Sequence, residues 1–293
     1  MKSGFISIIG KPNVGKSTLI NALLGEKIAI TSPKPQTTRH RITGVLNNPD
    51  YQMIFVDTPG MHEGKHLLGK TIDKVAVGSM QDVDVILLVV DRKYHAVDEP
   101  IIKRLLSQNS KVILVINKID ALSTKTLIDD IIISFLKVYP FSEVIPISAQ
   151  NKIHLDQLKT AILTYLPEGP QYFPADYVSD QSETKLASEI VRERILHHAE
   201  QEVPHAVTVI IESMNENLET KTLDVSALII VERPTQKQIL IGKNGEKLKQ
   251  IGKEARLEIN HLLNRKIHLS LWIKVKKDWR NNPNEIKRYG YGD

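Results

Sequence analysis

The residues GKPNVGKS at positions 10–17 have the types and spacing of a loop that binds phosphate. Glycines let the backbone pass close to a polyphosphate with its N–H groups pointing inward, and a helix that begins near Lys16 adds the positive end of its dipole. We expect Lys16 to reach the β- and γ-phosphates and the Ser17 hydroxyl to bind Mg²⁺. The alternative is a glycine-rich turn that binds nothing. The candidate nucleotide-binding residues of this loop are Asn13, Val14, Gly15, Lys16, Ser17 and Thr18.

A second polar turn, Asn117-Lys118-Ile119-Asp120, follows the apolar run 111–116 and could select the base. A carboxylate at Asp120 can accept hydrogen bonds from guanine N1–H and from the exocyclic amino group, neither of which adenine offers. The turn resembles the guanine-specificity motif of GTPases, in which Asn117 would brace the loop and contact N7 while the stem of Lys118 packs over the base. The same resemblance assigns the last guanine contact to Ser148 and Ala149. Alone, such a tetrapeptide recurs by chance as a surface turn, but here it lies downstream of the phosphate loop.

Between these motifs, the apolar run 53–56 delivers Asp57-Thr58-Pro59-Gly60 at its carboxyl end. Open α/β sheets bind ligands at that end, so we expect Asp57 to join the Mg²⁺ site. Gly60 can offer its backbone N–H to the γ-phosphate, a contact that is lost on hydrolysis. A threonine from the preceding Pro- and Ser-rich segment should close over Mg²⁺; we favour Thr38, with Thr37 as the alternative. The structural alternatives are a turn cap at Asp57 and a solvated hydroxyl at Thr38.

Hydrolysis cannot use the glutamine that many regulatory GTPases place after the Asp-x-x-Gly motif, because this chain has Met61 there. Asn13 resembles an asparagine that in some related GTPases helps hold K⁺ beside the phosphates, where a cation offsets charge on the leaving oxygen. The alternative is that Asn13 only adopts a turn conformation. The candidate catalytic residues are Asn13, Lys16, Thr38 and Gly60, with Mg²⁺ as cofactor and K⁺ as a candidate activator.

Short apolar strands alternate with helical segments in the first part of the chain, which predicts a doubly wound α/β domain with a mostly parallel sheet. The strand-like runs are 5–9, 53–56, 85–90, 111–116 and 144–147. Three prolines between positions 166 and 174 interrupt the helical periodicity and indicate a semi-rigid linker. We divide the chain into a nucleotide-binding domain (1–168), a linker (169–181), a second domain (182–280) and a C-terminal tail (281–293).

Composition agrees with more than one soluble domain, since 293 residues with 41% hydrophobic side chains suffice for a substantial core. The absence of cysteine excludes disulfides and thiolate metal sites and is compatible with a reducing cytoplasm. We expect neither a cleavable signal peptide nor a membrane span, because the phosphate loop comes too early and the apolar runs are too short. From residue 231 onward, 15 Lys and Arg stand against 7 Asp and Glu, whereas the preceding residues have 24 and 27. This gradient favours contact of the C-terminal part with nucleic acid or an anionic membrane.

The second domain contains a Gly-x-x-Gly turn ahead of a long helical segment, 246–263. The expected order is a helix (183–200), two strands (206–212 and 223–231), a short helix before the turn, the long helix and a last strand (267–276). This α-β-β-α-α-β order resembles the KH domain of type II topology, an α+β fold in which the glycine turn approaches single-stranded nucleic acid and an apolar groove receives unstacked bases. A helix–turn–helix joint that needs glycine for steric reasons alone is the alternative. The candidate RNA-binding residues are Ile241, Gly242, Lys243, Asn244, Gly245, Lys247 and Lys249.

Taken together, the chain is similar to the Era family, in which a P-loop GTPase domain is fused to a C-terminal KH domain. The resemblance extends over almost the whole sequence and includes QTTRHR at 36–41, DTPG at 57–60, FPAD at 173–176, SEIVRE at 188–193 and WIKVK at 272–276. It implies a GTPase of slow intrinsic turnover that binds GTP and GDP, holds the 3′ end of the 16S rRNA with its KH domain and acts in assembly of the 30S ribosomal subunit. It also implies a cytoplasmic monomer with peripheral association with the inner membrane.

Two other functions compete with this one. A membrane-surface regulatory GTPase whose KH-like domain binds a protein would show no nucleic-acid affinity with a steep salt dependence. A GTP-sensing binding module with negligible turnover would release no phosphate under any ionic condition.

Overall fold

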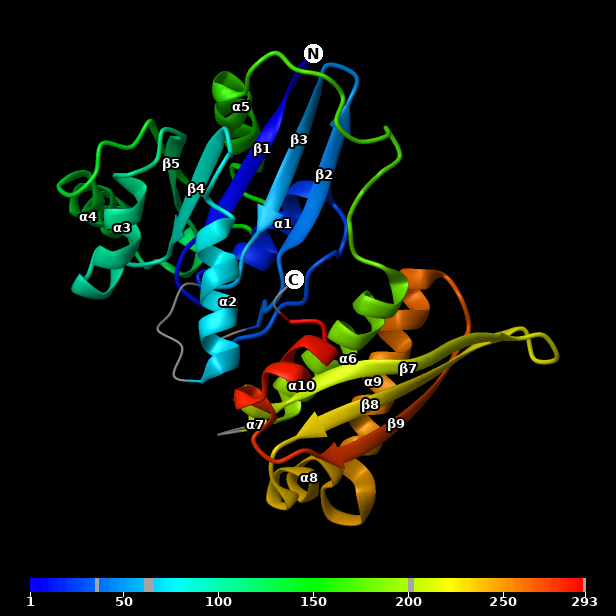
Figure 1. The fold of residues 1–293 in the computed structure, drawn as a ribbon. Helices are drawn as coiled ribbons and strands as arrows, with labels where there is room; N and C mark the ends of the chain where they lie inside the picture. Colours follow the sequence, from blue (N-terminus) through cyan, green and yellow to red (C-terminus); the bar gives the residue numbers. More distant parts are fainter. Residues whose placement is uncertain (35–36, 61–65, 200–202, 292–293) are drawn as a thin grey trace. The chain divides into compact units, whose positions relative to one another are not determined.

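The computed structural model describes residues 1–34, 37–60, 66–199 and 203–291 of the chain, which folds as two compact units (Figure 1). The first unit comprises Met1–Ala29, Thr38–Glu63 and Ile72–Asp180, and the second comprises Ile30–Thr37, Gly64–Thr71 and Gln181–Asp293. Two short segments from the N-terminal half therefore belong to the second unit. The two units therefore cannot be separated by one boundary in the sequence.

The first unit is built on a six-stranded sheet. Its strands are β1 (Lys2–Ile9), β2 (Ile42–Asn48), β3 (Tyr51–Asp57), β4 (Val85–Val90), β5 (Lys111–Ile116) and β6 (Glu143–Pro146). Their order in the sheet is β2-β3-β1-β4-β5-β6, with β2 antiparallel to β3 and every other neighbouring pair parallel. The carboxyl ends of the five parallel strands therefore share one edge, where ligands bind in such sheets.

Helices cover both faces of this sheet. They are α1 (Lys16–Leu24), α2 (Leu67–Gly78), α3 (Glu99–Leu105), α4 (Lys125–Leu136) and α5 (Leu155–Tyr165). In β4, Val85, Leu87 and Val89 join a core with α1 and α5, whereas the alternate residues join a second core with α2, α3 and α4. Burial on both faces is why the central strands β4 and β5 have nearly continuous apolar sequences. The predicted doubly wound α/β domain is confirmed.

The stretch predicted as a linker lies along the edge of the sheet. The Val45 N–H of β2 donates to the Val178 carbonyl at 2.8 Å, and the Thr43 N–H donates to the Asp180 carboxylate at 3.0 Å. The Gln52 side chain donates to the Phe173 carbonyl at 2.8 Å. These bonds occupy polar groups that an edge strand would otherwise leave unpaired, and they keep this stretch within the first unit up to Asp180.

The second unit is an α+β domain with a three-stranded sheet. Its elements are α6 (Glu183–His198), α7 (Val203–Ala206), β7 (Thr208–Asn217), β8 (Thr222–Val231), α8 (Pro234–Ile241), α9 (Glu246–Leu263), β9 (Ile267–Val275) and α10 (Pro283–Arg288). The sheet order is β7-β8-β9, with β7 antiparallel and β9 parallel to β8. Alternate residues of β8 pack against α6 and α9 in one core. This is the predicted KH domain of type II topology, extended by α10.

Candidate functional site

The loop at residues 10–17 takes its shape from residues with positive φ. The angle is 150° at Gly10, 66° at Asn13 and 96° at Gly15. A Cβ atom on Gly15 would lie 2.2 Å from Nδ2 of Asn117, and a Cβ atom on Gly10 would lie 2.4 Å from the Val89 carbonyl oxygen. Both positions therefore require glycine. The loop ends at the N-terminus of α1, where the backbone N–H groups have no partners inside the helix and attract anions.

Lys16 is buried at the end of this loop and turned back into it. Its ammonium group donates to the carbonyl oxygens of Gly10 at 3.2 Å and Lys11 at 3.0 Å. Burial lowers the pKa of Lys16 from 10.5 to about 8, and the nearby Asp57 carboxylate opposes that shift. A bound polyphosphate would provide the missing negative charge and favour the protonated amine.

Three residues of the first unit meet in one cluster: Ser17 at the start of α1, Thr38 ahead of β2 and Asp57 at the end of β3. The hydroxyl oxygens of Ser17 and Thr38 lie 2.7 Å apart, and Oδ2 of Asp57 accepts from Ser17 at 3.2 Å and from Thr38 at 3.4 Å. The other carboxylate oxygen of Asp57, Oδ1, is buried and has no hydrogen-bond partner among the described residues. Two hydroxyls beside a carboxylate with an unpaired oxygen form the hard oxygen set that Mg²⁺ prefers, so these residues fit that ion.

Burial also alters the protonation of Asp57. It raises the pKa of the carboxyl from 3.8 to about 6, whereas Lys16 and the hydrogen bonds from Ser17 and Thr38 lower it. The hydroxyl of Thr37, the other threonine weighed from the sequence, donates instead to the Lys34 carbonyl at 2.7 Å. Of these two threonines, only Thr38 lies in the oxygen cluster.

The predicted base-binding turns are tied to the phosphate loop by Asn117. Its Nδ2 donates to the Val14 carbonyl at 2.8 Å, and its Oδ1 accepts from the Ala149 N–H at 3.0 Å. Ser148 is buried next to Ala149. The structure thus brings the turns at 117–120 and 148–149 to the loop at 10–17, as the sequence predicts.

The side chains of Lys118 and Asp120 differ in their surroundings. Lys118 donates to the Asn13 carbonyl at 2.5 Å and pairs with the Asp91 carboxylate at 2.7 Å. Asp120 is exposed, and its carboxylate has no hydrogen-bond or ion-pair partner within the described ranges. An exposed, unpaired carboxylate at this turn is open to a base that offers two donors.

Gly60 lies against the phosphate loop at the end of the described segment 37–60. A Cβ atom there would come within 2.8 Å of Pro12, so this close approach also requires glycine. Met61, which stands where many regulatory GTPases have a glutamine, lies outside the described residues.

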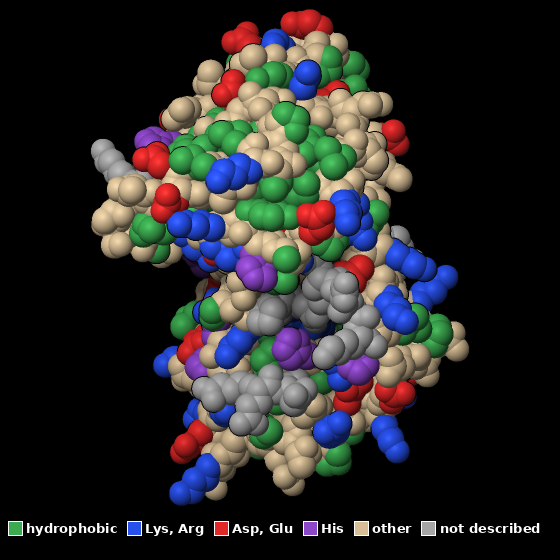
Figure 2. Space-filling model, turned by 90° about the vertical axis from the view of Figure 1, so that its left-hand side faces the viewer, with side chains coloured by type: hydrophobic (Ala, Val, Ile, Leu, Met, Phe, Trp, Pro, Cys, Tyr) green, Lys and Arg blue, Asp and Glu red, His purple; other side chains and the backbone are tan. Residues whose placement is uncertain are grey.

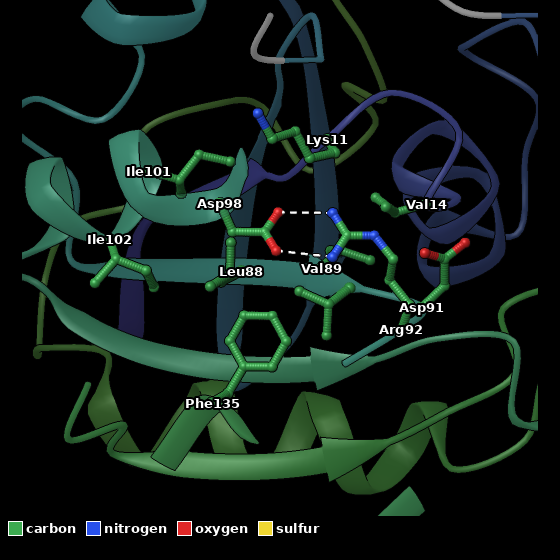
Figure 3. A pocket seen from close by; sticks show the side chains of 11 residues that line it. Lys11, Val14, Leu88, Val89, Asp91, Arg92, Asp98, Ile101, Ile102 and Phe135 are labelled. Atoms are coloured by element: carbon green, nitrogen blue, oxygen red, sulfur yellow. Dashed lines mark hydrogen bonds and ion pairs between the residues drawn. The ribbon is translucent and has the colours of Figure 1, made fainter. Parts of the chain in front are cut away.

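A small cavity beside the phosphate loop is lined by Lys11, Val14 and residues of β4, α3 and α4 (Figure 3). Its volume is about 20 Å³, which is room for one water molecule and far too little for a nucleotide. Figure 3 shows the paired hydrogen bonds from Arg92 to Asp98, at 2.8 and 3.0 Å, that hold the start of α3 against the end of β4. We therefore interpret this cavity as a packing gap.

The Gly-x-x-Gly turn of the second unit joins α8 to α9. Gly242 has φ 71°, Asn244 has φ 52° and Gly245 has φ 79°, and a Cβ atom on Gly242 would lie 2.7 Å from Cβ of Lys247. Lys243 and Asn244 are exposed at its tip. The turn leads into the N-terminus of the 18-residue helix α9, so its backbone combines close approach with a favourable dipole for phosphate.

An open groove of about 840 Å³ continues from this turn between α9 and β9. Leu248, Gly252, Leu269 and Leu271 give it an apolar floor, and Lys249, Lys253 and Arg256 give it a basic wall that also includes Glu246. A Cβ atom on Gly252 would lie 3.2 Å from Leu271, so the glycine keeps the floor low. The candidate RNA-binding residues omitted Leu248, Gly252, Lys253 and Arg256 of α9 and the two leucines of β9. The basic side of α9 is visible in the sequence as the helical spacing of 249, 253 and 256, whereas the leucines read only as core.

Sequence reasoning also missed two buried residues of α6 that hold the segment Ile30–Thr37. The Glu193 carboxylate accepts from the Thr31 N–H at 2.7 Å and from the Thr31 hydroxyl at 3.2 Å. The guanidinium of Arg192 donates to the Thr37 carbonyl. No local pattern predicts these bonds, because about 160 residues of sequence separate the partners.

The described residues contain no group of three or more His, Asp and Glu side chains placed to hold a metal ion. No described helix is both long and apolar enough to cross a membrane.

Comparisons with known proteins agree with this division. A family model described as 50S ribosome-binding GTPase matches residues 5–118, and a KH domain model matches residues 202–280. GTPase Era of Clostridioides difficile is 48% identical to this chain, covering 100% of it and 99% of the relative, and GTPase Era of Heliobacterium modesticaldum is 47% identical over 100% and 98%.

Two solved structures resemble the chain over its full length. A variant of Aquifex aeolicus Era bound to GDP and AlF₄⁻ superposes with a TM-score of 0.95, at 42% identity and 99% coverage of both chains. Era in complex with MgGDPNP and nucleotides 1506–1542 of 16S ribosomal RNA gives a TM-score of 0.96, at the same identity and coverage.

Proposed function

This chain belongs to the Era family of GTPases, and from that membership we propose that it hydrolyses GTP at the loop of residues 10–17 and binds the 3′ end of 16S rRNA through its KH domain. The purpose of the RNA contact is assembly of the 30S subunit, without chemistry on the RNA. We further propose that the protein acts as a cytoplasmic monomer. We also propose that the nucleotide-binding domain ends at residue 168, the linker at residue 181 and the KH domain at residue 280.

The oxygen cluster of Ser17, Thr38 and Asp57 is the observation that carries the catalytic part. Bound Mg²⁺ would neutralise charge on the β- and γ-phosphate oxygens. Lys16, held at the base of the loop, adds a second positive charge where the leaving oxygen becomes negative. The Gly60 N–H donates to the γ-phosphate before hydrolysis, and Thr38 loses its place when that phosphate departs.

The test of base selection is the variant Asp120→Asn. It should lose GTP hydrolysis and gain hydrolysis of xanthosine triphosphate, because an amide matches the altered base edge. Phosphate release with each of the two nucleotides and with ATP, in the presence and absence of Mg²⁺, measures this. A variant that kept its preference for GTP would contradict the assigned base contact.

We also propose that K⁺ activates hydrolysis through Asn13. The support is the position of this residue within the phosphate loop, where its positive φ is equally compatible with a turn role. Turnover should rise when K⁺ replaces Na⁺, and Asn13→Ala should erase the difference. Equal rates of the unaltered protein in the two salts would leave Asn13 as a turn residue.

For RNA, the supporting observations are the exposed turn at 242–245, the basic groove beside it and the rRNA in the solved Era complex. Replacing both Lys243 and Asn244 with aspartate should abolish binding through repulsion of phosphate. GTP hydrolysis should survive this change. Filter binding of an oligonucleotide with the sequence of the 16S rRNA 3′ end, at several salt concentrations, measures the loss.

Contact with an anionic membrane is a second candidate, favoured by an apolar surface on the first unit (Figure 2). Leu106, Ile133 and Leu136 of the α3 and α4 region are each about half exposed or more. Exposed Lys137 follows Leu136 directly, and exposed Lys103, which pairs with Glu99 at 3.5 Å, lies three residues before Leu106. Apolar side chains with basic neighbours suit a membrane interface. Leu106→Asp with Leu136→Asp should reduce cosedimentation with anionic vesicles, and unchanged cosedimentation would contradict this candidate.

A further inference from the structure

The face of the KH sheet that points away from α6 and α9 carries a row of apolar side chains that is only partly buried. Strand register places Trp272 of β9 opposite Leu228 of β8, and Leu228 opposite Ile210 of β7. Because side chains alternate between the faces of a strand, these three lie on the face opposite to the core residues of β8. Trp272 is 63% exposed, and no aromatic ring of the described residues stacks against it.

The neighbouring row of the same face is covered by the C-terminal residues. Thr208 pairs with Ile230, and Ile230 with Lys274. The Thr208 hydroxyl lies 2.8 Å from the Tyr291 hydroxyl, and Ile230 is fully buried. Trp279, which precedes α10, is buried and donates to the Ala206 carbonyl at 2.9 Å. The cover ends before the row of Trp272.

Charge beside the open row favours a polyanion. Lys274 is exposed two residues from Trp272 and has no acidic partner among the described residues, and Lys276 lies 3.4 Å from Glu285 of α10. Lys287 and Arg288 of α10 add two exposed cations. At the β7 end of the row, the exposed Glu212 lies two residues from Ile210, and Asp224 of β8 lies 3.8 Å from His268. The lysine end of the open row therefore carries a net positive charge.

The open row and the groove described above lie on opposite faces of the sheet and share the strand β9. β9 is an edge strand, and its Leu269 and Leu271 line the groove on one face while Trp272, the next residue, projects from the other face. A nucleic-acid strand that fills the groove and continues over the edge of β9 would reach Trp272 within the length of a few nucleotides. Exposed aromatic rings beside cations are the platforms on which proteins stack unpaired bases.

We propose that Trp272, flanked by Lys274, is a second RNA contact of the KH domain, on which an unpaired base stacks when single-stranded RNA extends beyond the groove. This inference rests on the proposed RNA-binding function and extends it to the opposite face of the sheet. It explains why the aromatic side chain with the largest exposed fraction in the described chain lies on the basic edge strand.

Two RNA lengths separate the groove from the platform. A short oligonucleotide of roughly four nucleotides fills a KH groove, and a longer one of roughly twelve nucleotides can continue over β9. Trp272→Ala should lower the affinity for the longer RNA by roughly 5- to 100-fold and leave the affinity for the short RNA unchanged. Trp272→Phe should retain most of the affinity for the longer RNA. Leu218→Ala removes a more exposed side chain at the β7–β8 turn and should change neither.

Fluorescence gives a second reading, because the only other tryptophan of the sequence, Trp279, is fully buried. The longer RNA should quench Trp272 emission and protect it from acrylamide, and the short RNA should do neither. Unchanged emission and unchanged affinity of Trp272→Ala for the longer RNA would overturn the inference and favour a protein as the occupant of this face. If the Lys243 and Asn244 double variant still lost RNA binding in that case, the proposed function would stand; if it bound RNA normally, the proposed function itself would fail.

Discussion

Lys16 and Asp57 are buried titratable groups at the proposed nucleotide and Mg²⁺ site, and without these ligands the burial of their charged forms lowers the stability of the protein. The folded pKa of Asp57, about 6, lies above its ordinary 3.8, so its contribution to stability is present below pH 4 and lost as the pH rises through 6. The folded pKa of Lys16, about 8, lies below its ordinary 10.5, so its contribution is present above pH 10.5 and lost as the pH falls through 8. Between pH 6 and 8 both groups destabilise the nucleotide-free protein.

The neutral double variant Lys16→Met with Asp57→Asn should therefore gain stability over the unaltered protein. The gain in free energy of unfolding should be larger between pH 6 and 8 than at pH 4 or 10 by roughly 1–3 kcal/mol. Urea unfolding of both nucleotide-free proteins across this range measures it. A difference that does not vary with pH would show that neither group is perturbed as described.

The sequence predicted the tight phosphate loop correctly at positions that accept only one residue type. Gly10 and Gly15 are such positions, because any other side chain would clash with Val89 or Asn117. The choice between Thr37 and Thr38 could not be made in that way. It depends on which hydroxyl reaches Ser17. In an irregular segment the sequence has no periodicity that would indicate which of two adjacent side chains points toward the site.

At the scale of elements, the strands and helices were predictable because their apolar residues repeat with the periods of buried sheets and amphipathic helices. The seven-residue edge strand β2, which pairs only with β3 in the described sheet, was not anticipated, because its sequence ITGVLNN is not a continuous apolar run. The attachment of Ile30–Thr37 to α6 was equally invisible. It depends on single hydrogen bonds to Glu193 and Arg192 rather than on a pattern.

This attachment predicts a role for Glu193 in metal binding. Glu193→Ala removes the acceptor of two Thr31 hydrogen bonds, so the segment that leads into Thr38 loses an anchor. We expect the Mg²⁺ concentration for half-maximal binding of a non-hydrolysable GTP analogue to rise roughly 5- to 30-fold, in line with a total of about 1–2 kcal/mol for the two lost hydrogen bonds. Binding of GDP should change little, because Thr38 is not needed there.

Two matched variants control for general destabilisation. Glu193→Gln keeps an acceptor oxygen for the Thr31 N–H and should preserve most of the Mg²⁺ response. Glu254→Gln weakens the contact of α9 with His198 of α6 and does not touch the segment. If Glu193→Ala lowered the melting temperature but left the Mg²⁺ titration unaltered, the anchor would be structural only.

At the scale of the whole molecule, the segment Ile30–Thr37 connects the part of the chain proposed to hydrolyse GTP with the part proposed to bind RNA. It belongs to the compact unit that contains the KH domain, whereas the next residue, Thr38, belongs to the unit that contains the phosphate loop. Thr38 is thus the direct neighbour of a segment that is hydrogen-bonded to α6. A movement of Thr38 on loss of the γ-phosphate would act on that segment through the backbone. If the nucleotide alters this segment, RNA affinity must depend on the nucleotide, and RNA must alter nucleotide affinity by the same factor.

The most direct test is a titration of labelled RNA with the sequence of the 16S rRNA 3′ end into the protein loaded with a non-hydrolysable GTP analogue or with GDP. The account predicts two different dissociation constants, whose ratio equals the ratio by which saturating RNA changes the affinities for the two nucleotides. The Lys243 and Asn244 double variant should lose RNA binding in both states. Identical RNA affinities in the two nucleotide states would contradict the account and leave a GTPase and a KH domain that act independently on one chain.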